Sequence, residues 1–336
     1  TGIGSLPHLN ADSALDLIFK HVPHMPFWPQ LPKRSPLEGM VAQFSEGMPC
    51  IRVNGSGVSI DTRDRERELE RFYEKTISQD LEYFKITDIY AAGLYGFLNR
   101  LNAFSAGFSF IKLHTTGPFT FAAGITDEAG VCVLHDKIMM QAYLEGLRMK
   151  ALWQIRLFKR FNKKILFFID EPYLSCFGSA YTPVNREDIV LALNDFTAGL
   201  KSEGVTIGLH CCGNTDWSLF TGCEGIGLIS FDAFSFLEKF TLYAEDIRGF
   251  LDRGGIISWG VVPTQSFAAP QSTDLFTGKI LSGIEALGRK GLDKFLLRER
   301  MIVTPACGLG TFTEDNAQKV FKALSDVSEF IRRGFK

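Results

Sequence analysis

The 336-residue sequence predicts an α/β fold, a (β/α)8 or TIM barrel, and three observations lead to this class. Short apolar, β-branched runs alternate with longer amphipathic runs, and repeated β-then-α units give parallel strands. About eight such units in a chain of this length favour a closed barrel over an open sheet. Polar residues end several of the runs, where the catalytic residues of such barrels lie. We expect residues 1–336 to form one domain.

The predicted strands are short runs bounded by turn residues. Seven are predicted, at residues 2–5, 108–114, 165–170, 205–210, 227–232, 256–261 and 301–304. A candidate for the eighth lies at residues 50–53, where the Gly-rich segment 54–57 also suggests a hairpin turn. Amphipathic helices are predicted at residues 134–161, 186–203, 243–253, 273–290 and 314–333, and three of them end at a glycine, a common C-cap.

Residues 25–49 interrupt this pattern. The segment is rich in proline and also contains large aromatic residues: Pro26, Phe27, Trp28, Pro29, Pro32 and Pro36. Because its aromatic side chains favour burial, we expect an ordered, irregular excursion that covers one side of the site.

The composition limits the classes of partner. The chain is 46% hydrophobic and 22% charged with a net charge of −2, which gives no reason to expect nucleic acid or a membrane surface as a partner. It contains no apolar run of about 18 residues that would indicate a membrane span, and no signal peptide is visible. Seven scattered cysteines do not indicate a secreted disulfide framework. We therefore expect a cytoplasmic protein with free thiols.

Three residues of the kind that bind zinc follow two of the predicted strands. His210 ends the run at 205–210, Cys212 comes two residues later, and Cys307 follows the run at 301–304. Because side chains alternate along a strand, His210 and Cys212 point to the same side and Cys211 points away. Three protein ligands leave the fourth position of zinc open, as in catalytic sites. The alternative is that these are buried cysteines and a hydrogen-bonded histidine.

Four motifs, in the same order along the chain, resemble the catalytic barrel of cobalamin-independent methionine synthase, within the superfamily of uroporphyrinogen decarboxylase and the methylcobalamin:coenzyme M methyltransferases. They read TGIGSLP at 1–7, IDEP at 169–172, HCC at 210–212 and PACGL at 305–309. The segment LHCCGN at 209–214 is equally similar to the coenzyme M methyltransferases. Porphyrinogen decarboxylation is not implied, because that branch has no zinc–thiolate site.

The resemblance implies specific roles for these residues. It implies zinc bound by His210, Cys212 and Cys307, with Asp232 as a further candidate ligand that is one methylene shorter than the family's glutamate. Asp170 matches the carboxylate that holds the amino group of homocysteine. Gly4 and Ser5 match the loop that holds the carboxylate of homocysteine. A second amine-binding glutamate of the family has no counterpart that we can place.

Two departures from the family pattern bear on the methyl donor. The chain matches only the catalytic half of the two-barrel folate enzyme, and residues 258–263 lack that enzyme's acid histidine. Methyl-folate needs protonation to leave, whereas a methyl-corrinoid does not. The prediction is therefore methyl transfer to homocysteine, which forms methionine, from a methyl-corrinoid donor carried by a corrinoid protein. The alternatives are a methylcobalamin:coenzyme M-type thiol methyltransferase and a structural zinc or corrinoid-binding protein. His114 is left open between contact with a substrate and core packing.

Overall fold

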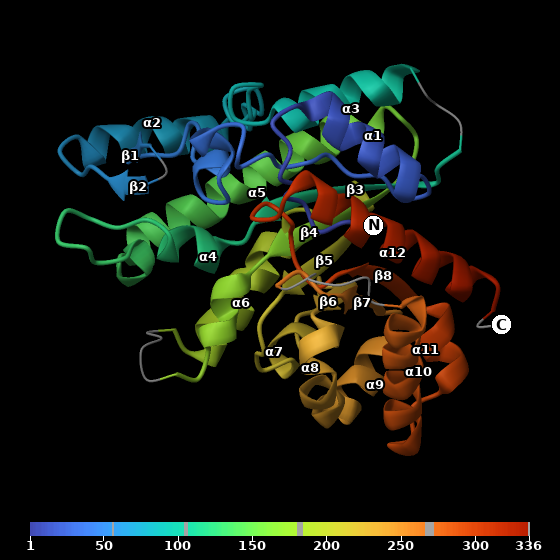
Figure 1. The fold of residues 1–336 in the computed structure, drawn as a ribbon. Helices are drawn as coiled ribbons and strands as arrows, with labels where there is room; N and C mark the ends of the chain where they lie inside the picture. Colours follow the sequence, from blue (N-terminus) through green and yellow to red (C-terminus); the bar gives the residue numbers. More distant parts are fainter. Residues whose placement is uncertain (56, 104–106, 180–183, 266–271, 335–336) are drawn as a thin grey trace.

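The computed structural model describes residues 1–55, 57–103, 107–179, 184–265 and 272–334 (Figure 1). Its centre is a six-stranded, all-parallel sheet in the order β3-β4-β5-β6-β7-β8, with neighbours in sequence also neighbours in space. The strands are β3 (Phe110–Thr116), β4 (Lys164–Asp170), β5 (Thr206–Cys211), β6 (Leu228–Phe231), β7 (Ile256–Val262) and β8 (Met301–Pro305). All six correspond to predicted strands, shifted by at most two residues at either end.

The prediction of a closed eight-stranded barrel is wrong for the described residues, because the regular strands form a curled half-barrel. Two irregular segments continue from its edges. Residues 26–30 join β3 by a single bridge between Phe27 and Lys112, and residues 1–6 join residues 26–30 by a bridge between Ser5 and Gln30. On the other side, the Thr1 nitrogen donates to the Val303 carbonyl of β8 at 3.1 Å. Prolines in residues 26–32 lack the N–H that a regular ladder requires, which explains why these segments form bridges rather than strands.

The predicted eighth strand at residues 50–53 is also wrong as a barrel strand. β1 (Ile51–Asn54) pairs antiparallel with β2 (Gly57–Ile60) in a separate two-stranded sheet. This hairpin lies beside α2, away from the large sheet (Figure 1). The turn signal in residues 54–57 therefore indicated the local structure better than the apolar run did.

Helices connect the strands and cover the sheet. They are α1 (Ala11–His21), α2 (Arg65–Ile77), α3 (Ala92–Ala103), α4 (Pro118–Ala123), α5 (Lys137–Lys159), α6 (Arg186–Ala198), α7 (Ser218–Thr221), α8 (Ala233–Phe240), α9 (Ala244–Asp252), α10 (Thr273–Arg289), α11 (Lys294–Glu299) and α12 (Glu314–Arg332). α5 packs on β3 and β4, α8 and α10 pack on β7, and α12 packs on β8. Within the described residues, no helix combines the length and the apolar character needed to cross a bilayer.

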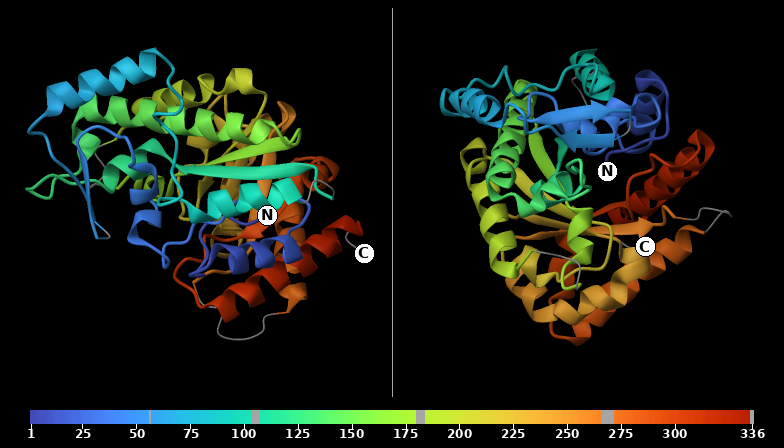
Figure 2. Two further views of the ribbon diagram at one scale, coloured as in Figure 1. Left: turned by 90° about the horizontal axis from the view of Figure 1, so that it is seen from above. Right: turned by 90° about the vertical axis from the view of Figure 1, so that its left-hand side faces the viewer.

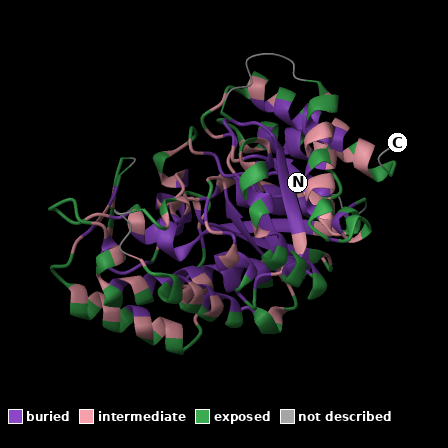
Figure 3. Cartoon of the chain, turned by 90° about the horizontal axis from the view of Figure 1, so that it is seen from below, coloured by how far each residue is buried: buried purple, intermediate pink, exposed green. Residues whose placement is uncertain are grey.

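The sheet is buried on both faces, as expected for parallel strands. Figure 2 shows its curl from β3 to β8, and Figure 3 shows buried strands inside helices whose outer faces are exposed. The register places Asp170 beside His210, His210 beside Ser230, and Ser230 beside Ser258. These four polar residues form one row across β4 to β7, near the carboxyl ends of the strands.

Candidate metal centre

His210, Cys212 and Cys307 come together at the carboxyl ends of the strands. Their ligand atoms all lie within 4.8 Å of one another, and they form the one such group of metal-binding residues found in the described part of the chain. Donors that bind one tetrahedral zinc at about 2.0–2.3 Å are roughly 3.5–3.8 Å apart, so the observed spacing fits an ion of this size with a small adjustment.

The geometry of β5 separates the three residues of the HCC segment. His210 and Cys212 line a cavity, whereas Cys211 points to the opposite face and is fully buried in the hydrophobic core. The Cys211 thiol donates to the Gly213 carbonyl, and burial raises the pKa of this thiol well above its usual range. Cys211 is therefore a core residue, in agreement with strand alternation.

Ser230 fixes the ring of His210. The His210 Nδ1 lies 3.0 Å from the Ser230 hydroxyl oxygen, and both side chains are buried. The other ring nitrogen, Nε2, is buried and has no hydrogen-bond partner among the described residues. Because a nitrogen that binds a metal must offer its lone pair, Nδ1 would carry the proton and donate to Ser230, which leaves Nε2 as the ligand. Sequence reasoning missed Ser230, since a serine within an apolar strand carries no motif.

The Cys212 and Cys307 thiols shift each other's pKa in opposite directions. A hydrogen bond from Cys307 lowers the pKa of Cys212, and the nearby His210 lowers it further. The same hydrogen bond raises the pKa of the Cys307 thiol, together with burial. One thiolate is thus stabilised in the group, and a thiolate is the form of cysteine that binds metals. The donor set, two sulfurs and one imidazole nitrogen, suits zinc.

These ligands line a cavity of about 600 Å³ at the carboxyl ends of the strands. Its wall also contains the other residues that the sequence singled out, namely Gly4, Ser5, Asp170 and Asp232, together with Gln30, Lys33 and Met40 of the irregular excursion. The predicted metal and substrate residues are therefore neighbours in one site, although they come from distant parts of the chain.

Asp170 ends β4 with an unsatisfied oxygen. Its Oδ1 is buried and has no hydrogen-bond partner in the described part of the chain. Burial raises the pKa of Asp170, and the buried Lys112 ammonium on β3 opposes this change. A buried carboxylate oxygen without a donor is costly, so this atom suits a cationic or N–H donor on a ligand.

The Ser5 loop packs tightly against the loop that follows Cys307. The Ser5 hydroxyl accepts from the Gly310 N–H at 3.2 Å, and the Ser5 carbonyl accepts from the Leu309 N–H at 2.8 Å. A Cβ at Gly308 would lie 2.2 Å from the Ser5 hydroxyl oxygen, so a side chain at this position would displace the Ser5 hydroxyl. The contact fixes Cys307 relative to Ser5.

Asp232 lines the cavity but caps a helix. Its Oδ1 accepts from the Ser235 N–H at 2.8 Å at the N-terminus of α8, and it does not belong to the group of three ligands. His114 is not among the residues that line the cavity; its ring stacks on Trp28 with centroids 3.9 Å apart. The stacking occupies one face of the His114 ring, whereas both ring nitrogens are buried without a hydrogen-bond partner among the described residues, so the role of His114 stays open.

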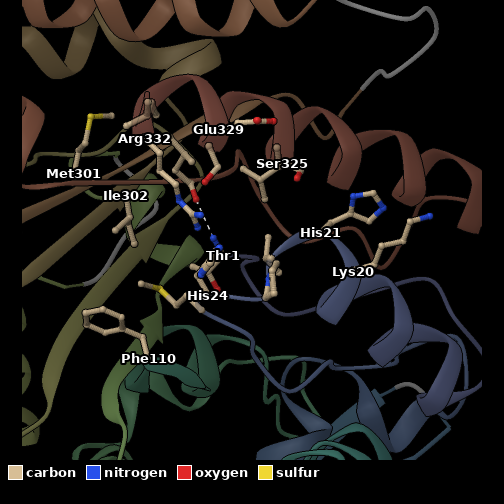
Figure 4. Close-up of a pocket in the computed structure, with 17 residues that line it drawn as sticks. Thr1, Lys20, His21, His24, Phe110, Met301, Ile302, Ser325, Glu329 and Arg332 are labelled. Atoms are coloured by element: carbon tan, nitrogen blue, oxygen red, sulfur yellow. Dashed lines mark hydrogen bonds between the residues drawn. The ribbon is translucent and has the colours of Figure 1, made fainter. Parts of the chain in front are cut away.

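A second cavity, of about 490 Å³, opens at the amino ends of the strands. Figure 4 shows His21, His24 and Glu329 around it, together with Thr1 and Arg332. These residues do not form a group with metal-binding spacing. Active sites of barrel-like α/β proteins lie at the carboxyl ends of the strands, so the cavity beside His210 is the candidate site.

Comparisons with known proteins support the fold and nothing beyond the fold. No family model and no curated protein matches the chain. Among solved structures, a vitamin-B12-independent methionine synthase from Listeria monocytogenes, itself a provisional assignment, has a TM-score of 0.54 and 12% identity over 96% of this chain and 85% of that chain. A D-tagatose 3-epimerase-like protein matches with a TM-score of 0.40 and 10% identity over 73% of this chain and 85% of that chain. An IOLI protein with a bound zinc atom matches with a TM-score of 0.34 and 12% identity over 66% of this chain and 89% of that chain.

Proposed function

We propose that the protein is a zinc-dependent methyltransferase that transfers a methyl group to the thiol of homocysteine and so forms methionine. The observation that carries the proposal is the group of His210, Cys212 and Cys307 in the wall of a cavity at the carboxyl ends of the strands. A set of three protein ligands leaves one position open for a substrate. Zinc held there would lower the pKa of a substrate thiol, which is about 8.5 in water, and so keep it nucleophilic at neutral pH.

Two further parts of the cavity wall would suit the ammonium and carboxylate groups of an amino acid. The unsatisfied Asp170 Oδ1 would accept from the ammonium group. Gly4 and Ser5, held against the loop after Cys307, would bind the carboxylate. These contacts would fix the substrate at its far end, so that its sulfur lies beside His210, Cys212 and Cys307. The volume of about 600 Å³ is within the range of about 300–1,000 Å³ that small-molecule sites have.

The lack of a histidine other than the ligand His210, among the described residues of the cavity wall, supports a donor that leaves without a proton. Among the described residues that line the cavity, His210 is the one histidine, and the proposal uses it as a ligand. On β7, the Ser258 hydroxyl is 3.3 Å from that of Thr304, and Trp259 is buried. We therefore propose a methyl-corrinoid as the donor. A corrinoid is several times larger than homocysteine, so it would approach the mouth of the cavity, presented by a corrinoid protein.

Asp170 also bears on the choice of acceptor. A coenzyme M-type substrate carries a sulfonate and no ammonium group, so it would leave the buried Asp170 oxygen without a donor. The ammonium group of homocysteine would donate to the Asp170 Oδ1, and we favour homocysteine as the acceptor for that reason. A purely structural zinc site would not need a cavity beside its ligands.

The proposal is tested by methionine formation. Zinc-loaded protein is incubated anaerobically with L-homocysteine and methylcobalamin, and methionine is measured by mass spectrometry. We expect methionine from the native protein and from Cys211→Ala, whose side chain faces the core. We expect at least about a 100-fold loss for Cys307→Ala, because a missing ligand costs more than a missing outer contact. Equal activity of the two variants would contradict the proposal.

A further inference from the structure

A chain of buried amides ends in the cavity at Gln30. Gln30 is 8% exposed and lines the same cavity as Asp170. Its backbone pairs with the Ser5 loop: the Leu6 N–H donates to the Gln30 carbonyl at 2.8 Å, and the Gln30 N–H donates to the Gly4 carbonyl at 3.1 Å. Gln30 is therefore a direct neighbour of the loop that we assign to the substrate carboxylate.

The hydrogen bonds define which way the Gln30 amide points. The Gln43 Nε2 donates to the Tyr90 carbonyl at 2.8 Å, and a backbone carbonyl can only accept. The Gln43 Oε1 must therefore accept, and it does so from the Gln30 Nε2 at 2.9 Å. The Gln30 Oε1 is left as the outer end of the chain, and it accepts no hydrogen bond from the described residues.

Two acceptors on residues of the cavity wall thus lack a donor among the described residues: the Asp170 Oδ1, which is buried, and the Gln30 Oε1, which is not fully buried. Asp170 lies on β4, whereas Gln30 lies on the irregular segment beyond β3, so the two line the cavity from different elements. The Asp170 Oδ1 is buried without a compensating hydrogen bond, which is costly, whereas the Gln30 Oε1 is open to a ligand that enters the cavity. A ligand that brings several N–H donors on one atom would satisfy both.

We infer that Gln30 is a specificity-determining residue, which binds the substrate ammonium group together with Asp170. This inference rests on the proposed function for the identity of the substrate as an amino acid. An ammonium group has three N–H donors, and it would use one on the Asp170 carboxylate and one on the Gln30 carbonyl. Gln43 acts as a positioning residue, because it holds the Gln30 amide in the orientation that presents its oxygen.

A binding experiment separates this role from methyl transfer. Metal-loaded protein is titrated calorimetrically with L-methionine and with 4-(methylthio)butyrate, which has the same thioether and carboxylate but no ammonium group. We expect the native protein to bind L-methionine about 100-fold more tightly or better. We expect Gln30→Met to weaken L-methionine binding about 10- to 100-fold, the worth of a hydrogen bond to a charged group. Binding of 4-(methylthio)butyrate should change less than about twofold, since it makes no such bond.

Two results would overturn the assignment. One is equal binding of the two ligands by the native protein, and the other is an equal loss for both ligands in Gln30→Met, which would indicate a structural role. Thermal melting and zinc content establish that the variant is folded. If it is not, Gln30→Asn retains the amide and withdraws its oxygen by one methylene, and the same selective loss is expected. Selective loss without methionine formation in the activity assay would sustain the role of Gln30 and contradict the proposed methyl transfer.

Discussion

At the scale of single residues, the site depends on side chains that differ widely in how visible they are in the sequence. The grouping of His210, Cys212 and Cys307 could be predicted, because their residue types and positions at strand ends are typical of zinc ligands. Ser230 and Gln30 could not be predicted. Their roles come from the hydrogen bonds to His210 Nδ1 and Gln43 Oε1, and those bonds depend on strand register and on the path of an irregular segment.

Ser230 gives a prediction for metal affinity. Ser230→Ala removes the hydrogen bond that orients the His210 ring, and loss of such an outer contact lowers metal affinity about 10- to 100-fold. Ser258→Ala is a matched control, because Ser258 is the register partner of Ser230 on β7, is equally buried, and bonds to Thr304 instead. Competition with a chromophoric chelator measures both. A similar affinity for the two variants would contradict the role of Ser230.

At the scale of elements, the curl of the sheet brings the three candidate ligands, His210, Cys212 and Cys307, together. Cys307 follows β8, and His210 ends β5, three strands away in the sheet. Neighbouring strands are about 4.8 Å apart, so a flat sheet would separate these residues by roughly 14 Å. The ligand atoms instead lie within 4.8 Å of one another. Curvature, together with side chains that point to the inner face, therefore accounts for the site.

The order of strands and helices could be predicted from the sequence, but closure of the barrel could not. Apolar runs identify β3 to β8 because these strands are buried on both faces. The same criterion fails for residues 2–5, which form an isolated bridge, and for residues 50–53, which form a hairpin. Residues 26–30 are irregular, as expected for the excursion at 25–49. Pairing partners are long-range, and a local pattern carries little information about them.

β3 carries a buried cation that the apolar pattern obscured. Lys112 is fully buried, donates to the Ile3 carbonyl, and lies 4.7 Å from the centre of the Phe168 ring. Burial lowers the pKa of Lys112 to about 8, and Asp170 partly opposes this shift. The lysine counterbalances the Asp170 carboxylate at the cost of its own hydration.

Lys112 gives a prediction for the pH dependence of stability. Its pKa is lower in the folded protein than the ordinary 10.5, so the unfolded chain binds more protons between about pH 8 and 10.5. The contribution of Lys112 to the free energy of unfolding therefore rises with pH in that window, by up to about 3 kcal/mol. Urea unfolding at pH 7.5 and pH 10 should show native protein gaining stability relative to Lys112→Met. A difference between the two proteins that does not change with pH would contradict the burial of a charged lysine.

At the scale of the whole molecule, the candidate metal centre lies at one end of the sheet and a cavity without such a centre lies at the other. The amino ends of the strands surround the cavity in Figure 4, which lacks a metal-binding group among the described residues. The carboxyl ends gather the metal group, the Asp170 carboxylate, the Ser5 loop and the Gln30 amide around one cavity. The irregular excursion contributes to this end, as the sequence led us to expect: Trp28 is buried, and Gln30 and Met40 lie on the cavity wall.

Zinc K-edge X-ray absorption shows whether His210, Cys212 and Cys307 hold zinc with one position open to a thiol. Without substrate, we predict two sulfurs and one nitrogen from the protein. With L-homocysteine, we predict a third sulfur at about 2.3 Å, and no change with L-homoserine, which has a hydroxyl in place of the thiol. A first shell that stays the same with homocysteine would show a closed, structural site and would contradict the account.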